Sequence, residues 1–247
     1  MIGRWIFIRD GRLSRTTKAV LVLLVLIALV GLLPLRLVLG AANGSGSLSA
    51  SEVAGTAWDG AAGDFTAGGL PLGSLYVALR PLPLLLGRTE FSLNRPAMPG
   101  QPEFHAAARG GEGWVLLKEA NGQIDLAGLM APLPVRALSF ADFQVEMNEG
   151  ACVSASGQLG LIVPSLGPAL PGDTILSGPA SCEDGALVVP MVGPTGTEKL
   201  NLTLRPDSTW QADLMLAGLP VEVAGPLIEM GFTEKPGGLG FSARGTL

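Results

Sequence analysis

The sequence is poor in the side chains that carry most enzyme chemistry. Its 247 residues include one histidine, two cysteines and one tyrosine, and only 15% of them are charged. Catalysis by a Ser-His-Asp or Cys-His arrangement would have to use His105, which lies on the polar side of an Ala-rich segment with strand-like alternation. No catalytic motif surrounds His105, so we expect a surface residue, no catalytic residues, and a protein that is not an enzyme.

The same scarcity argues against a bound metal or nucleotide. Two cysteines and one distant histidine cannot fill a tetrahedral zinc shell without other ligands. The glycine-rich residues 110–113 are not followed by a Lys-Ser or Lys-Thr pair at the spacing of a phosphate-binding loop. We therefore expect no metal site and no cofactor.

Positive charge is scarce in most of the chain and is concentrated at its amino-terminus. Residues 43–247 hold ten of the sixteen Lys and Arg but twenty of the twenty-one Asp and Glu, so their formal charge is −10. A nucleic-acid partner requires a basic face, so we expect no nucleic acid to bind. The amino-terminal cations are Arg4, Arg9, Arg12, Arg15 and Lys18, with Asp10 as the one acid among them.

A long apolar run follows these cations. Residues 19–35 contain no charge, and about 17 apolar residues is the lower limit for a helix that crosses a bilayer. We expect one transmembrane helix within residues 19–42, with residues 1–18 in the cytoplasm by the positive-inside bias and the remainder exported. A cleaved signal peptide is the alternative, because Gly40, Ala41 and Ala42 offer a small-residue cleavage site.

The exported residues are typical of an all-β domain. Thirty-five glycines and nineteen prolines separate short apolar runs, as in chains with many turns. We expect a flexible Gly/Ser tether at residues 43–51 and then a β-rich domain at 52–247, with sub-halves 52–131 and 135–247. Period-two alternation predicts about ten to thirteen short antiparallel strands. They would form an elongated curved half-open sheet or a sandwich, with one short helix at residues 221–230.

Two local predictions can be made within this domain. Asn121-Gly122 lies between two apolar runs and is the strongest hairpin signal in the chain. Pro81 and Pro83 disfavour a regular helix or a central strand, so residues 84–86 are predicted to form a buried turn.

The two cysteines, Cys152 and Cys182, both lie in the exported part. An isolated pair in an oxidising compartment usually forms a disulfide, which here would close a loop of about thirty residues. Two free buried thiols or a metal site with further ligands are the alternatives.

One stretch near the start of the domain is more specific. Residues 55–60 hold Trp58 between Gly55 and Gly60, and Gly69-Leu70-Pro71-Leu72-Gly73 follows. Together with residues 75–81, the Cys182–Gly185 segment and residues 187–191, this stretch resembles protein N of the type II secretion system. The motif residues that the resemblance marks as structural are Gly55, Trp58, Gly60, Leu70, Pro71 and Gly73.

The resemblance implies an accessory component of the type II protein secretion system. Such a protein would sit in the cell inner membrane by one helix and hold its β-domain in the periplasm. Its partners would be other system components, in the inner-membrane platform, the secretin or both, besides the lipid bilayer. Exposed strand edges or loops would make those contacts. We expect Trp58 to be a core residue, with an exposed anchor for a partner as the alternative.

A membrane-anchored β-groove that binds or bridges lipids is the alternative function. One face of such a groove would be apolar and open to acyl chains. The test is whether that face is covered in the folded chain, and the residues that decide it are Leu75, Val77, Leu200, Leu202 and Trp210.

Overall fold

The computed structural model describes residues 15–42, 48–111, 113–126, 128–165 and 172–246. Two helices come first, α1 (Arg15–Gly31) and α2 (Leu35–Ala42). They are separated at Pro34, because a proline inside a helix removes a backbone donor and clashes with the preceding turn. The single helix predicted within residues 19–42 is thus divided in two. Neither α1 nor any other helix of the described ranges is both long and apolar enough to span a membrane.

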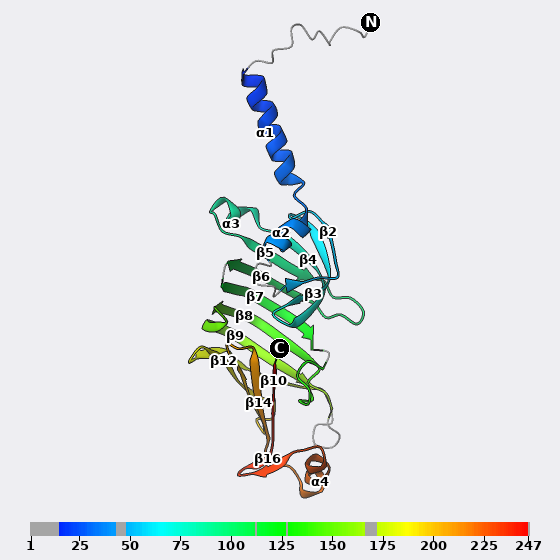
Figure 1. Cartoon of the computed structure of the whole chain (residues 1–247). Coiled ribbons are helices and arrows are strands. Elements are labelled where there is room, and N and C mark those ends of the chain that lie inside the picture. The colour runs from blue at the N-terminus through cyan, green and yellow to red at the C-terminus, as the bar shows by residue number, and fades with distance from the viewer. Residues whose placement is uncertain (1–14, 43–47, 112, 127, 166–171, 247) are drawn as a thin grey trace.

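The described strands belong to one antiparallel sheet, which confirms the mostly-β architecture (Figure 1). The strands are β1 (Leu48–Ser49), β2 (Glu52–Gly55), β3 (Gly60–Ala67), β4 (Leu70–Leu79), β5 (Glu90–Arg95), β6 (Phe104–Gly111), β7 (Trp114–Asp125), β8 (Ala137–Asn148), β9 (Ala151–Val163), β10 (Thr174–Pro179), β11 (Ser181–Glu183), β12 (Ala186–Val192), β13 (Glu198–Leu204), β14 (Thr209–Leu216), β15 (Thr233–Lys235) and β16 (Gly238–Thr246). Most consecutive strands pair as neighbours, so the sheet follows the chain.

The sheet is continuous and bends along its length. It passes the Pro-rich residues 131–135 without a break, because β7 pairs directly with β8. Figure 1 shows β4 to β9 succeeding one another away from α1, whereas β14 and β16 cross them steeply. The last helix, α4 (Val221–Glu229), lies at the end opposite α1 and agrees with the helix predicted at residues 221–230.

One face of the bent sheet forms a continuous apolar core. Leu35 of α2 and Leu227 of α4 belong to the same buried cluster as the strand residues. The five residues that test for an open groove are all buried, with exposed fractions of 3% for Leu75, 1% for Val77, 1% for Leu200, 8% for Leu202 and 2% for Trp210. These side chains therefore do not line an open trough.

The predicted hairpin at Asn121-Gly122 is wrong. Strand β7 runs unbroken through both residues, and its pairing with β8 shifts register on either side of Ala120. Asn121 accepts a hydrogen bond from the Asp142 backbone N–H (2.8 Å) and donates its side-chain amide to the Asp142 carboxylate (3.1 Å). A contact 21 residues away therefore holds Asn121 in an irregular strand, where a local turn was predicted.

The predicted buried turn at residues 84–86 is also wrong. Residues Pro81–Leu85 form a short helix, α3, with a proline in its first turn, where the missing N–H has no helical partner to lose. Leu82 is 75% exposed and Leu86 is 76% exposed. The prolines take the chain out of the sheet after β4, and the described residues leave these leucines uncovered.

The disulfide between Cys152 and Cys182 is confirmed. It joins the start of β9 to β11, with the two Cα atoms 5.5 Å apart. Strand β11 in turn pairs with β12 at Ser181, Cys182 and Glu183, whereas β10 pairs with β12 only at Ser177 and Val192.

Candidate functional site

The Gly-Trp-Gly motif lies where the amino-terminal helices meet the sheet. The Trp58 indole donates a hydrogen bond to the Val30 carbonyl, near the end of α1 (2.8 Å). The Ala57 N–H donates to the Leu33 carbonyl in the link between the two helices (2.7 Å). Trp58 is partly buried and lies against α1, so the expectation that it belongs to the sheet core is wrong. Beside it lies an apolar hollow of about 370 Å³, lined by Leu26, Ile27, Val30, Gly31 and Trp58.

The two glycines of the motif make room for α2. Leu35 is fully buried, and a Cβ on Gly60 would lie 2.6 Å from its Cδ2 atom. Gly55, at the end of β2, has a positive φ and faces the Asp59 carbonyl and Gly60. Pro34 forms a backbone bridge with Thr56 across the same contact. The motif therefore forms a socket that fastens the chain leaving α1 to the first strands of the sheet.

The second part of the motif, residues 70–73, borders a buried arginine. Arg95 is 4% exposed, and its guanidinium group donates to the carbonyls of Pro102 (2.8 Å), Leu72 (2.5 Å) and Gln123 (2.5 Å). Leu70 and Pro71 lie in β4 before this contact. A Cβ on Gly73 would lie 3.1 Å from Arg95 Nη1, so only glycine leaves full room for the guanidinium group.

This arginine clamp is structural. Its three acceptors are backbone carbonyls from β4, β7 and the loop before β6, and the Phe104 ring lies 5.9 Å from the guanidinium carbon. Burial lowers the pKa of Arg95, but an arginine remains protonated and donates throughout. The clamp joins three segments at a bulge in β4.

A second buried charge lies next to α3. Glu90 is 4% exposed and pairs with Arg80 (2.8 Å) and with the Nε atom of Arg109. Burial works against ionisation of Glu90, but the hydrogen bonds and charges of Arg109 and Arg80 outweigh it, so the pKa lies below its usual value. This ionic cluster ties the ends of β4, β5 and β6 together.

The remaining titratable groups are dispersed. Glu198 accepts a hydrogen bond from Thr195 (2.6 Å), and Asp213 accepts from Ser242 (2.6 Å) and Gln211 (2.9 Å). His105 is exposed on β6, as predicted. Within the described residues, no three or more His, Cys, Asp or Glu side chains are grouped so that they could hold a metal ion.

A shallow hollow of about 380 Å³, with a mixed polar and apolar lining, extends over β7 to β10. Its polar lining includes Gln123, Ser139, Gln158 and Ser177, one from each strand. Amides and hydroxyls can form hydrogen bonds, but they are not acids or bases near neutral pH. The hollow therefore offers polar contacts without proton transfer.

The topology-determining cations are only partly within the described ranges. Arg4, Arg9 and Arg12 lie outside the described residues, Arg15 is the first residue of α1, and Lys18 is exposed on α1. Most of the predicted tether, residues 43–47, also lies outside them. Its later residues Leu48 and Ser49 form β1, which pairs with β3.

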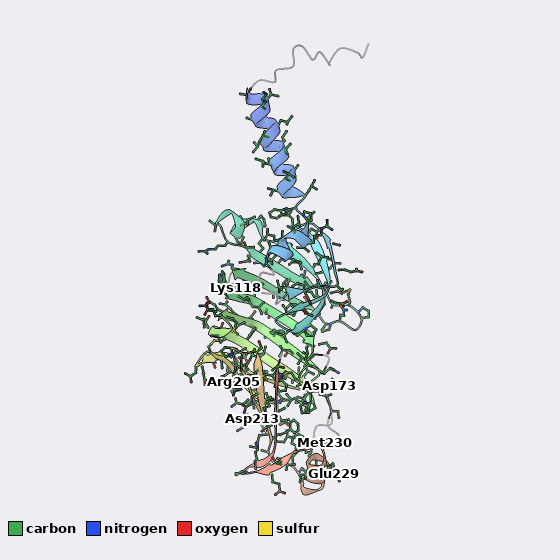
Figure 2. All side chains as sticks on the ribbon, viewed as in Figure 1. Lys118, Asp173, Arg205, Asp213, Glu229 and Met230 are labelled. Carbon is green, nitrogen blue, oxygen red and sulfur yellow. A yellow bond between two sulfur atoms is a disulfide. The ribbon has the colours of Figure 1, made fainter. Side chains whose placement is uncertain are left out.

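Exposed apolar surface is most extensive on α1. Large apolar side chains from Val20 to Val30 are between 49% exposed, at Val25, and 63% exposed, at Leu29. They occur on all sides of the helix, because the run is almost continuous in sequence. Figure 2 shows these side chains projecting around α1, with no other described segment beside them above its junction with the sheet.

The comparisons with known proteins add one match. The family model described as "Type II secretion system (T2SS), protein N" matches residues 46–241. No curated protein and no solved structure matches the chain. The matched segment includes the socket glycines, Trp58, Arg95 and both cysteines, and it begins after α2.

Proposed function

Because the chain belongs to the family of type II secretion system protein N, we propose that it is an accessory component of this system in the inner membrane. In this proposal α1 anchors the chain, the sheet occupies the periplasm, and the protein works by contacts with other components of the system. It catalyses no reaction. The family match over residues 46–241 is the observation that carries the proposal.

The apolar surface of α1 supports the anchor. A helix that is apolar on all sides is stable only when lipid or protein covers it, and its described leucines and valines are exposed. The first four of its seventeen residues are polar, so the apolar residues 19–31 rise about 20 Å, less than a hydrocarbon core of about 30 Å. A short apolar span is accommodated by local thinning of the bilayer. Leu32, which is 71% exposed, continues the apolar surface beyond the helix.

Reporter fusions test this topology. A reporter that is active only outside the cytoplasm, fused after Leu247, is expected to be active, and one that is active only in the cytoplasm is expected to be silent. Neutralising Arg4, Arg9, Arg12, Arg15 and Lys18 together should scramble the orientation, because these cations set it. Neutralising Lys118 and Arg205, which lie in the sheet region, is the matched control and should have no effect. An active cytoplasmic reporter on the unmodified chain would contradict the anchor.

The ends of the sheet are the proposed contact surfaces. The strand path ends at β15, whose three residues Thr233–Lys235 are all exposed. An unpaired strand edge offers backbone donors and acceptors to a strand of a partner. A Glu234→Pro variant removes one backbone donor from this edge, whereas Glu234→Ala keeps it. We expect only the proline variant to recover fewer partner components from solubilised membranes, at an unchanged Tm. Equal recovery would exclude this edge.

A further inference from the structure

The loop between β4 and β5 presents an apolar tip at the α1 end of the molecule. The tip consists of α3 and the residue after it, with Leu82 75%, Leu84 39% and Leu86 76% exposed. Figure 1 shows α3 at the same end of the sheet as the foot of α1, with α4 and β16 at the other end. Pro81 and Pro83 stiffen the tip, so that presenting the leucines costs little conformational entropy.

Cations flank this apolar tip. Arg88 is exposed and forms no ion pair with any described residue, whereas its neighbour Arg80 is held by Glu90. Arg36 is exposed on α2, at the same end of the molecule. Exposed leucines beside an exposed guanidinium group match the boundary of a bilayer, where acyl chains meet anionic phosphates.

The neighbouring surface favours lipid over protein as the partner. The apolar surface of α1 continues through Leu32, at 71% exposed, and reaches Leu37 on α2, at 59% exposed. Trp58 lies at the foot of α1, and tryptophan is enriched at the level of lipid headgroups. If α1 is embedded in a bilayer, the α3 tip and the end of α1 therefore lie at the same bilayer surface.

We propose that residues 81–88 form a second membrane contact on the periplasmic side. The three leucines enter the acyl boundary of the facing leaflet, and Arg88 binds an anionic phospholipid headgroup. This inference rests on the anchor of the proposed function and deepens it. Because the socket around Leu35 fastens the helices to the sheet, a second contact fixes the tilt of the whole sheet, so that its far end points away from the bilayer.

The test uses the full chain in phosphatidylethanolamine–phosphatidylglycerol vesicles. The native cysteines form a disulfide, and the described residues include no free cysteine, so a single introduced thiol can be labelled. An environment-sensitive dye is placed on Leu82→Cys and, as a control, on Met230→Cys. Met230 is 51% exposed and lies at the far end of the molecule (Figure 2). A nitroxide quencher on the lipid acyl chains is expected to quench the Leu82 dye at least twofold and to leave the Met230 dye unchanged.

Flotation of the same vesicles at alkaline pH separates the two proposals. If the chain floats and the Leu82 dye is as bright as the Met230 dye, the second contact is wrong and the anchor stands. If the chain does not float, the anchor is wrong. If it leaves the vesicles even at neutral pH, both are overturned.

A charge variant tests the headgroup contact. Arg88→Gln should at least halve the quenching of the Leu82 dye in vesicles with phosphatidylglycerol, because an anionic attraction is lost. It should have no effect in vesicles of phosphatidylcholine alone. Arg205→Gln, at an exposed arginine in the sheet region, is the matched control and should change neither result. Quenching that depends on neither Arg88 nor anionic lipid would overturn the assigned role of Arg88.

Discussion

The proximal part of the sheet, β1 to β10, is built differently from the distal part, β12 to β16. The proximal ladders shift register between β3 and β4, β6 and β7, β7 and β8, and β8 and β9. The distal ladders from β12 to β16 have no such shifts. Two of the three buried charged residues among the described ones, Glu90 and Arg95, are proximal, and the third, Glu198, begins β13. At the irregular part of β4, where backbone groups lose ladder partners, Arg95 donates to the Leu72 carbonyl in their place.

The two parts are joined at a thin seam. One residue pair, Ser177 and Val192, links β10 to β12. The disulfide crosses the same region from β9 to β11, and the Cys152 N–H donates to the Gly185 carbonyl (2.8 Å). A covalent bond therefore reinforces a region where few ladder pairs join the two parts of the sheet.

Replacing the arginine of the clamp should cause the largest loss of stability. Arg95→Met leaves the carbonyls of Leu72, Pro102 and Gln123 without donors, and we expect a loss of about 4 kcal/mol in the free energy of unfolding. Hydrogen exchange should rise in β4 to β7 and stay unchanged in β13 to β16. Arg205→Met is the control, and a loss of stability equal to that of the control would mean that the clamp is dispensable.

The disulfide should come next. Cys152→Ala and Cys182→Ala each break the same bond, which closes a loop of about thirty residues, so each should cost about 3 kcal/mol. Hydrogen exchange of the backbone amides should rise in β10 to β12, on both sides of the seam. The double variant should be no less stable than either single one, and an additive loss would show that the cysteines act separately.

A substitution in the socket should lower the stability less than the two changes above, and it should mainly alter how firmly α1 is oriented. Trp58→Phe keeps an aromatic ring but loses the donor to Val30, which should cost about 1 kcal/mol. The distance distribution between spin labels at Leu23 and Tyr76 should broaden, because α1 is held less firmly. Trp114→Phe, at a tryptophan that is 38% exposed, is the control. An unchanged distribution would show that the indole hydrogen bond does not orient α1.

The ionic cluster should show the smallest effect on stability, and this effect should be present at neutral pH and disappear in acid. The pKa of Glu90 is lowered in the folded state. The contribution of Glu90 to the free energy of unfolding is therefore complete above the unfolded pKa of about 4.3, and it is lost as the pH falls through the folded pKa. Glu90→Gln should therefore weaken the dependence of stability on pH below about pH 4.5. Glu229→Gln, at an exposed glutamate that forms no ion pair with any described residue, should leave the pH dependence of stability unchanged. If the free energy of unfolding depended on pH in the same way for Glu90→Gln and for the unmodified chain, this role of Glu90 would be contradicted.

The same contrast explains what the sequence could predict. Distal strands such as β13 and β14 keep strict alternation at Leu200, Leu202 and Trp210, which is the pattern that predicts a strand from sequence. Several proximal features depend on partners far away in sequence. Asn121 forms a bulge because Asp142 binds it, which no local pattern reveals.

The sequence identified which residues belong to the site, but it predicted only part of what those residues do. The motif glycines were identified, but what they contact is known only from the fold, because Leu35 and Arg95 are distant in sequence. Arg95 follows Phe91 and Leu93 on the apolar side of β5, and a cation in that phase is a signal that could have been noticed. Its acceptors, spread from Leu72 to Gln123, could not have been predicted.

The most direct test of the account is the composition of complexes purified with the unmodified chain. The full chain should be isolated by a tag from solubilised inner membranes of cells that assemble an active type II secretion system. We predict that other components of the system co-purify and that they are absent when an unrelated membrane protein carries the tag. Recovery of the chain from those membranes without any of these components would contradict the proposed function.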